Sequence, residues 1–147
     1  MMTNESLCID DICFYSVDYR DILKEIDEKN FDIVPRYLNE PLYQADNYEW
    51  FYIGYKDYDV PAAIVCLTEN RYRENSLHLS VFQVAEPIRG LGIGGQVIRA
   101  LIKFAIQQNF NSFTLLAMND SLYSYYQKFG LKRNPDIAER LMEIDLA

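Results

Sequence analysis

Val84-Ala85-Glu86-Pro87-Ile88-Arg89-Gly90-Leu91-Gly92-Ile93-Gly94-Gly95 is the stretch that decides the fold, because it joins a predicted strand to a predicted amphipathic helix through a glycine-rich corner. Glycine lets the backbone approach an anion closely. Unpaired N–H groups in the first helical turn point toward that anion, and the helix dipole assists them. The corner therefore predicts a phosphate-binding loop, and the identity of the phosphate compound becomes the central question.

The chain has 147 residues and is half apolar, which predicts a single domain over residues 1–147 with one core. Its beginning carries acids where a signal peptide has a basic flank, and no stretch reaches the ~20 apolar residues of a membrane span. We therefore expect a cytoplasmic protein that makes no use of a membrane. Cys8, Cys13 and Cys66 form neither an even set nor a CxxC pair, and His78 is the only histidine, so we expect no disulfide framework and no metal site.

Charge is distributed unevenly along the chain. The formal net charge is −8, but residues 87–133 contain six basic side chains and a single acid, Asp120. The glycine-rich corner lies within this positive part, which suits an anionic cofactor there and a cationic partner elsewhere. A solvated acidic surface is the simpler interpretation of the remaining charge. No basic run indicates a nucleic acid partner.

The periodicity of apolar residues predicts the order β, α, α, three antiparallel strands, α, β, α, β. Strands are predicted over residues 12–16, 48–55, 61–68, 77–84, 113–118 and 141–146. Helices are predicted after a cap at Asp18, over residues 32–39, over about 92–108 and over 121–129, the last one ending at Gly130.

Two known phosphate loops match the corner only in part. Gly90 and Gly95 have Walker A spacing, but Gln96 and Val97 stand where that loop needs Lys and Ser or Thr. Gly90-x-Gly92-x-x-Gly95 also fits the dinucleotide fingerprint of an oxidoreductase, yet residues 110–118 contain no acid to hold a ribose. A nucleoside triphosphate site and a Rossmann domain are both disfavoured.

Arg89-x-x-Gly92-x-Gly94 resembles the pyrophosphate loop of the GNAT superfamily of acyl-CoA-dependent N-acyltransferases. The match extends to Val84 at the end of the preceding strand, to Asn119 closing the next one, and to Tyr126-Gln127-Lys128-Phe129-Gly130-Leu131. Leu131 replaces the usual Phe of that last motif. The resemblance implies an α/β fold with a central mixed, mostly antiparallel sheet flanked by helices, with acetyl-CoA as cosubstrate and no metal.

The resemblance also implies where the cofactor binds. Backbone N–H groups of the loop would hold the pyrophosphate, Arg89 would shape the loop entrance, and the pantetheine arm would pair with the strand before it. Asn119 would hydrogen-bond the arm where two strands diverge, and an N–H near Val84 would polarise the thioester carbonyl. The implied cofactor-binding residues are Phe82, Gln83, Val84, Arg89, Gly90, Leu91, Gly92, Ile93, Gly94, Gly95 and Asn119.

Three residues are candidates for acid–base chemistry. Tyr126 corresponds to the family tyrosine, which would give a proton to the departing CoA thiolate. The base is less defined, because Thr114 stands where many relatives have Glu. His78 lies eleven residues before Arg89 and is either the base or a structural residue, and Glu86 is the second candidate for the base, with an ordinary surface position as its alternative.

The resemblance implies an N-acetyltransferase that moves an acetyl group from acetyl-CoA to a primary amine by direct attack in a ternary complex. The alternative is a non-catalytic CoA-binding sensor or interaction module of the same fold. Tyr48, Trp50 and Tyr52 alternate with Phe51, Ile53 and Tyr55; at least one set should be core, and an exposed set would form a wall for a cationic amine. The acceptor is not identified by the sequence, its acidity favours polycations, and the resemblance allows a homodimer.

Overall fold

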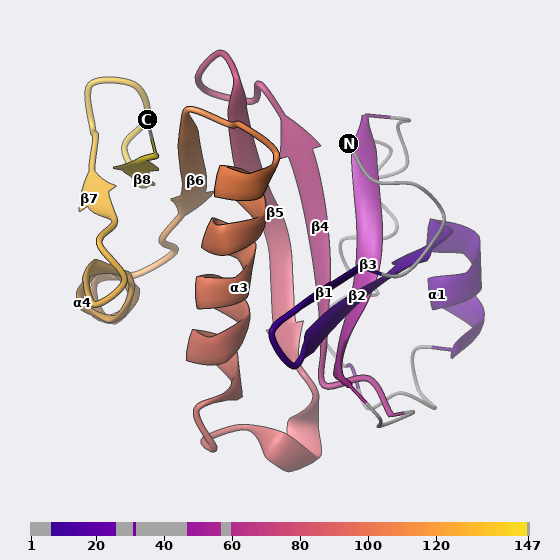
Figure 1. The fold of residues 1–147 in the computed structure, drawn as a ribbon. Helices are drawn as coiled ribbons and strands as arrows, with labels where there is room; N and C mark the ends of the chain where they lie inside the picture. Colours follow the sequence, from indigo (N-terminus) through magenta and orange to yellow (C-terminus); the bar gives the residue numbers. More distant parts are fainter. Residues whose placement is uncertain (1–6, 26–30, 32–46, 57–59, 147) are drawn as a thin grey trace.

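The computed structural model describes residues 7–25, 31, 47–56 and 60–146, with one eight-stranded sheet at its centre (Figure 1). The strands are β1 (Leu7–Ile9), β2 (Ile12–Val17), β3 (Tyr48–Tyr55), β4 (Ala63–Glu69), β5 (Ser76–Val84), β6 (Ser112–Leu116), β7 (Lys132–Arg133) and β8 (Leu141–Asp145). Their order across the sheet is β1-β2-β3-β4-β5-β6-β8-β7. The pair β5–β6 is parallel and the other pairs are antiparallel. The predicted mixed, mostly antiparallel sheet is confirmed.

Three α-helices lie within the described residues: α1 (Tyr19–Glu25), α3 (Ile93–Gln107) and α4 (Asp120–Gln127). The predicted cap of α1 is present, because Asp18 Oδ1 accepts the Arg20 N–H at 2.9 Å. The Arg20 side chain and backbone N–H lower the pKa of Asp18 to about 2. The helix predicted over residues 32–39 lies outside the described residues.

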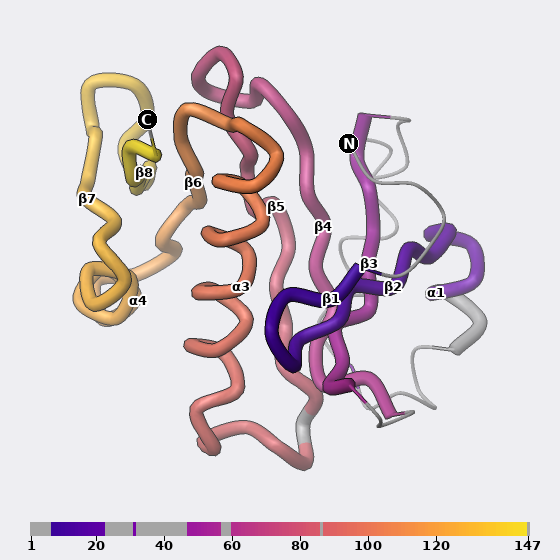
Figure 2. Tube along the Cα trace, in the orientation of Figure 1, coloured from indigo at the N-terminus to yellow at the C-terminus, as the bar shows by residue number. Residues whose placement is uncertain are grey.

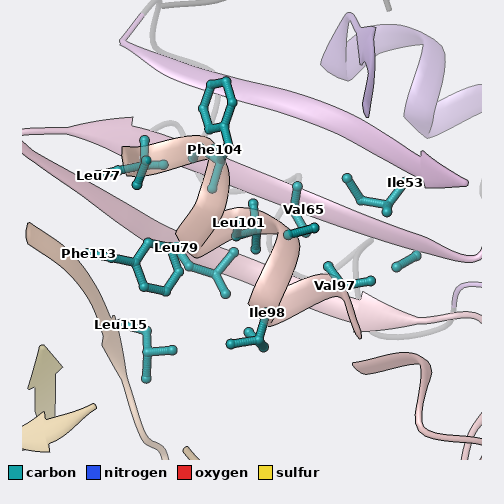
Figure 3. Packing of buried hydrophobic residues seen from close by; sticks show 14 of the residues in the cluster. Ile53, Val65, Leu77, Leu79, Val97, Ile98, Leu101, Phe104, Phe113 and Leu115 are labelled. Atoms are coloured by element: carbon teal, nitrogen blue, oxygen red, sulfur yellow. The ribbon is translucent and has the colours of Figure 1, made fainter. Parts of the chain in front are cut away.

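Helix α3 lies along one face of the sheet and forms the main core with it (Figure 3). Val97, Ile98, Leu101 and Phe104 are fully buried and recur at helical spacing, so one stripe of the helix faces the strands. The strands contribute alternate residues to this core, as a half-buried pleat requires. Among the labelled ones are Ile53, Val65, Leu77, Leu79, Phe113 and Leu115.

A second apolar cluster occupies the opposite face of β3, β4 and β5. It contains Tyr48, Trp50 and Tyr52 together with Ile22 of α1, and these aromatic side chains are at most 9% exposed. Phe51 and Ile53 are buried on the α3 face. Both aromatic sets of β3 are therefore core, and the prediction of an exposed aromatic wall for the acceptor is wrong.

Strand β5 contains a bulge. Leu67 pairs with Leu79 and Cys66 pairs with Val81, so Ser80 is an extra residue relative to β4. Before the bulge Leu77 and Leu79 belong to the α3-side core, whereas after it Phe82 packs on that side. Pairing with β6 ends at the same point, because the last register pair is Leu79–Leu115.

The prediction of no disulfide is wrong, because a disulfide joins Cys8 of β1 to Cys13 of β2 in the first hairpin. The sequence analysis did not predict β1, and it is the register of the β1–β2 hairpin that places these two cysteines directly opposite one another. Cys66 is free and buried, and burial raises the pKa of its thiol. The hairpin is tied to α3 through an ion pair of 2.6 Å between Asp10 and Lys103.

The C-terminal part completes one side of the sheet. The chain leaves β6 through α4, forms the short outer strand β7, and comes back as β8 between β6 and β7 (Figure 2). The two-residue strand β7 was not predicted, and β6 ends at Leu116 instead of Met118. No helix within the described residues is both long and apolar enough to cross a membrane.

Candidate functional site: a glycine loop at the open edge of β5

The glycine loop, residues 90–95, connects β5 to α3 through a backbone that requires glycine at two positions. Gly90 and Gly92 have φ values of 84° and 81°, in the left-handed region that side chains disfavour. Gly92 also forms the N-cap of α3. Arg89 holds the start of the loop, since its Nε donates to the Val84 carbonyl at 3.0 Å. The predicted role of Arg89 in shaping the loop entrance is compatible with this contact.

The beginning of α3 offers hydrogen-bond donors. The Gln96 N–H is the first to bond along the helix, to the Gly92 carbonyl at 3.3 Å. The N–H groups of Ile93, Gly94 and Gly95 therefore precede the helical ladder, and their direction and the helix dipole favour an anion. No acid occupies the first turn of α3 to compete for this position.

Gly94 and Gly95 allow α4 to approach the start of α3. A Cβ at Gly94 would lie 3.1 Å from the Tyr125 hydroxyl, and one at Gly95 would lie 3.2 Å from the Phe129 ring. Tyr125 also packs edge-on against Tyr126 and Phe129, with 5.3 Å between ring centroids in each case. Sequence analysis missed Tyr125, because the order of residues alone does not say which neighbouring tyrosine faces the loop.

The edge of β5 beyond Leu79 is open on its β6 side. No described strand pairs with that edge after the Leu79–Leu115 pair, so an extended molecule can add to it as a further strand. Phe82 and Val84 lie on the α3 side, within 3.8 Å of the Cβ position of Gly94. Gln83 is buried. The open edge leads directly into the glycine loop.

Asn119 lies at the start of α4, three residues after the end of β6. Its Oδ1 accepts hydrogen bonds from the Leu122 N–H at 3.0 Å and from Ser121 Oγ at 2.7 Å, so it caps the helix. The Asn119 side chain thus has a structural role, and its Nδ2 is the group left to donate to a ligand.

Tyr126 is 9% exposed and belongs to the α3-side core. Burial, with the nearby Tyr125 as a smaller cause, raises the pKa of Tyr126 to about 12. The phenol is therefore protonated throughout the neutral range and can act as a proton donor.

His78 is 4% exposed, and its Nδ1 lies 2.8 Å from Thr114 Oγ1. Its ring also meets Tyr72 edge-on, with 5.0 Å between centroids. Burial lowers the pKa of His78 to about 4, and the positive charge of Arg71 adds to this shift. The imidazole is neutral at pH 7 and is a weaker base than free histidine.

A polar row crosses the sheet at His78. The register places Thr68, His78, Thr114 and Glu143 side by side on β4, β5, β6 and β8. Glu143 was not predicted as a site residue. Its position between Met142 and Ile144 in an alternating strand does indicate that it lies on the face opposite these two apolar residues. The Glu143 carboxylate accepts from Arg73 at 2.8 Å and from Asn134 Nδ2 at 2.8 Å, so it is already engaged.

Two other predicted residues are Glu86 and Leu91. The side chain of Glu86 lies outside the described residues, so its role stays a prediction. Leu91 is 68% exposed at the tip of the glycine loop. Within the described ranges no group of three or more His, Cys, Asp or Glu side chains is placed to hold a metal.

The loop and the open edge together fit a ligand that has a phosphate joined to an extended polar arm. A Cβ at Gly90 or Gly92 would meet nothing within 4 Å, so the space over the loop is free for such a group. The charge of Arg89 and the first-turn N–H groups suit the phosphate, and the backbone of β5 suits the arm.

The model of the acetyltransferase (GNAT) family matches residues 17–131 of the chain. No curated protein sequence matches it significantly. The chain is similar in structure to the ribosomal-protein-alanine N-acetyltransferase of Escherichia coli, with a TM-score of 0.63 and 15% identity over 92% of this chain and 94% of that one.

Two further structures share the fold. A GNAT-family acetyltransferase of Staphylococcus aureus has a TM-score of 0.60 and 16% identity, over 92% of this chain and 98% of that one. The structure of AtaTR bound with acetyl-CoA has a TM-score of 0.67 and 12% identity, over 94% of this chain and 95% of that one. At these identities the likeness establishes the fold alone.

Proposed function

Because the chain belongs to the GNAT acetyltransferase family, we propose that it transfers an acetyl group from acetyl-CoA to a primary amine by direct attack in a ternary complex. The observation that carries this proposal is the continuity between the open edge of β5 and the glycine loop. One element offers a strand edge with no neighbouring strand among the described residues to an extended arm, and the next offers N–H donors to a phosphate. The family and the AtaTR complex with acetyl-CoA support the choice of cosubstrate.

Bound acetyl-CoA supplies an activated acetyl group as a thioester. Arg89 and the N–H groups of residues 90–95 bind the pyrophosphate, and residues 82–84 orient the arm by backbone pairing. Asn119 Nδ2 donates to the arm from the opposite side of the opening. A backbone N–H near Val84 stabilises the negative charge that develops on the carbonyl oxygen during attack.

Tyr126 is the proposed general acid, because its phenol keeps its proton and its position in the sequence corresponds to the family tyrosine. It donates this proton to the departing CoA sulfur. The amine loses one proton during attack, and neutral His78 is the proposed acceptor through Nε2, since Nδ1 is engaged with Thr114. Glu86 is the second candidate for this proton.

A non-catalytic CoA-binding module of the same fold is the alternative. It is favoured by one observation, namely that His78 has a pKa of about 4 and is therefore a weak base for an amine. The Glu143 carboxylate in the same row is engaged with Arg73 and Asn134, so it is not available as a stronger base.

Two measurements on the same variants separate the enzyme from the module. Ligand at ~100 times its Kd stabilises a protein by ~2.7 kcal/mol, so acetyl-CoA and CoA should raise Tm while NADH and ATP should not. Tyr126→Phe should lower kcat by ~10²- to 10⁴-fold and leave acetyl-CoA affinity unchanged. Tyr15→Phe, at an exposed tyrosine on β2, is the matched control and should keep full turnover. Acetyl-CoA binding without turnover on any amine would favour the module.

A further inference from the structure

A cavity of about 480 Å³ lies at the end of the sheet opposite the glycine loop. The β4–β5 turn contributes Tyr72, Arg73 and Glu74, the start of β6 contributes Ser112, and the C-terminal part contributes Ile137 and Asp145. In Figure 1 the β4–β5 turn and the connection between β7 and β8 lie at this same end, and the loop before α3 lies at the other. None of these residues has a role in the proposed cofactor site.

The cavity opens on the face of the sheet that carries His78. Ser112 and Asp145 are register partners, and they lie two residues from Thr114 and Glu143 on the same strands and therefore on the same face. Tyr72 contacts the His78 ring from that side, and Arg73 reaches Glu143 there. The cavity and the polar row thus lie on the same face of the sheet.

Ser112 is the observation that points to a ligand. It is 3% exposed, and within the described part of the chain its Oγ has no hydrogen-bond partner. A buried hydroxyl without a partner is destabilising, and such groups are uncommon in folded proteins. Ser112 lines the cavity, so a ligand that donates a hydrogen bond there would satisfy it.

The charge of the cavity favours a cation. Among the described residues of its lining Arg73 is the one basic residue, and its guanidinium is bound to both oxygens of Glu143 at 2.9 and 2.8 Å. Glu74 and Asp145 form no ion pair within the described part of the chain, so two carboxylates are left to attract positive charge. The Tyr72 ring and Ile137, which is 43% exposed, add an apolar surface for methylene groups.

The distance to the reaction centre sets the length of the ligand. The strands β5 and β6 separate at Ser80, four residues along β5 from Ser76, which pairs with Ser112. At ~3.3 Å per residue, the cavity lies about 13 Å from the point where the acetyl group would be presented. Only an extended molecule can occupy both places.

We propose that this cavity binds the distal ammonium group of a linear polyamine whose other end is the acetylated amine. The inference rests on the proposed function and names its substrate class. Glu74 and Asp145 attract the distal ammonium, and Ser112 Oγ accepts a hydrogen bond from one of its N–H groups. Tyr72 and Ile137 pack against the aliphatic chain. The near amine reaches the opening between β5 and β6 beside His78.

Calorimetric titration of spermine, 1,3-diaminopropane and hexylamine into the CoA-saturated protein tests the proposal, together with steady-state acetylation of the same amines. Spermine should bind at least about tenfold tighter than diaminopropane, which is too short to bridge the two places, and than hexylamine, which lacks the distal charge. The pair Glu74→Gln and Asp145→Asn should weaken spermine binding about tenfold, raise its KM similarly and leave the KM of hexylamine unchanged.

Two further variants serve as a second probe and a control. Ser112→Ala should weaken spermine binding about threefold without loss of stability, because Oγ has no hydrogen-bond partner among the residues that the structure describes. Asp136→Asn removes one exposed carboxylate from the connection between β7 and β8, outside the cavity lining, and should leave spermine binding unchanged. An equal loss in this control would assign the effect to net charge and overturn the proposal.

The outcomes distinguish this inference from the proposed function. If hexylamine and spermine are acetylated equally well and the cavity variants leave both unchanged, the cavity proposal is overturned and the acetyltransferase stands. If spermine binds in the predicted order but no amine is acetylated, the cavity is supported as a polyamine site and the acetyltransferase proposal fails. Absence of spermine binding overturns the cavity proposal whatever the turnover.

Discussion

The two faces of the parallel pair β5–β6 are both buried, yet they carry opposite chemistry. Toward α3 the side chains are Leu77, Leu79, Phe113 and Leu115. On the other face they are Ser76, His78, Ser112 and Thr114, all at most 4% exposed. An apolar face contributes packing energy, whereas a buried polar face costs stability unless its groups are paired. The polar face is therefore where a functional reason for the sequence should be sought.

The largest expected effect is on the apolar face. Phe113→Ala should lower the free energy of unfolding by ~3–5 kcal/mol, since a fully buried ring leaves a cavity against α3. Ile106→Ala, at a position of α3 that is 50% exposed, should cost ~0.5 kcal/mol. Urea unfolding followed by circular dichroism measures both, and equal losses would contradict the assigned core face.

The next effect concerns His78 and depends on pH. Its folded pKa of about 4 lies below the unfolded value of 6.5, so only the unfolded chain takes up a proton between these values. The contribution of His78 to the free energy of unfolding is fully present above pH 6.5. It decreases by ~3 kcal/mol as the pH falls toward 4. The difference in unfolding free energy between wild type and His78→Gln should shift by this amount between pH 7 and pH 4. A constant difference would show that His78 titrates normally.

The glycine loop extends the comparison from side chains to backbone. Gly92→Ala should cost ~1–2 kcal/mol and weaken acetyl-CoA binding about tenfold, because its φ of 81° is unfavourable for an L side chain. Gly54→Ala is the control, since its Cβ would meet the Tyr15 ring at an ordinary 3.5 Å. Thermal unfolding with and without acetyl-CoA measures both effects, and a normal ligand-induced shift in Gly92→Ala would contradict the role of the loop.

The smallest effect is expected at Ser112 on the polar face, and its neighbour Thr114 provides the contrast. Thr114→Val removes the partner of His78 Nδ1 and should cost ~1–3 kcal/mol. Ser112→Ala removes a hydroxyl that has no hydrogen-bond partner among the described residues and should change stability by less than ~0.5 kcal/mol. Chemical unfolding without ligand measures both. A large loss in Ser112→Ala would reveal a structural bond at Oγ.

Local signals predicted the central part of the fold. Glycine spacing, a strand-length apolar run and helical periodicity give β5, the loop, α3 and β6 with errors of one or two residues at their ends. The two shortest strands, β1 and β7, were missed because two or three residues carry no measurable period. The disulfide was missed with β1, since only the hairpin register places Cys8 opposite Cys13.

The candidate site was predictable only where it is local in sequence. The glycine loop and Asn119 follow from motif spacing, but the row of His78, Thr114 and Glu143 depends on pairing between strands 29 or more residues apart. Likewise, only the packing of α4 on α3 shows that the Tyr125 hydroxyl faces Gly94. Most of the site contacts that were not predicted therefore depend on pairing or packing between segments far apart in the sequence.

The bulge at Ser80 divides β5 into two halves whose side chains alternate independently. In a regular strand every second side chain lies on the same face of the sheet, so the face of each residue is fixed along the whole strand. One additional residue reverses that alternation, which lets Leu79 and Phe82, three positions apart, both turn toward α3. Deleting Ser80 would exchange inside and outside for all residues from Val81 to the glycine loop. The ligand-facing half of β5 is thus specified independently of its core-forming half, and the two can diverge separately in evolution.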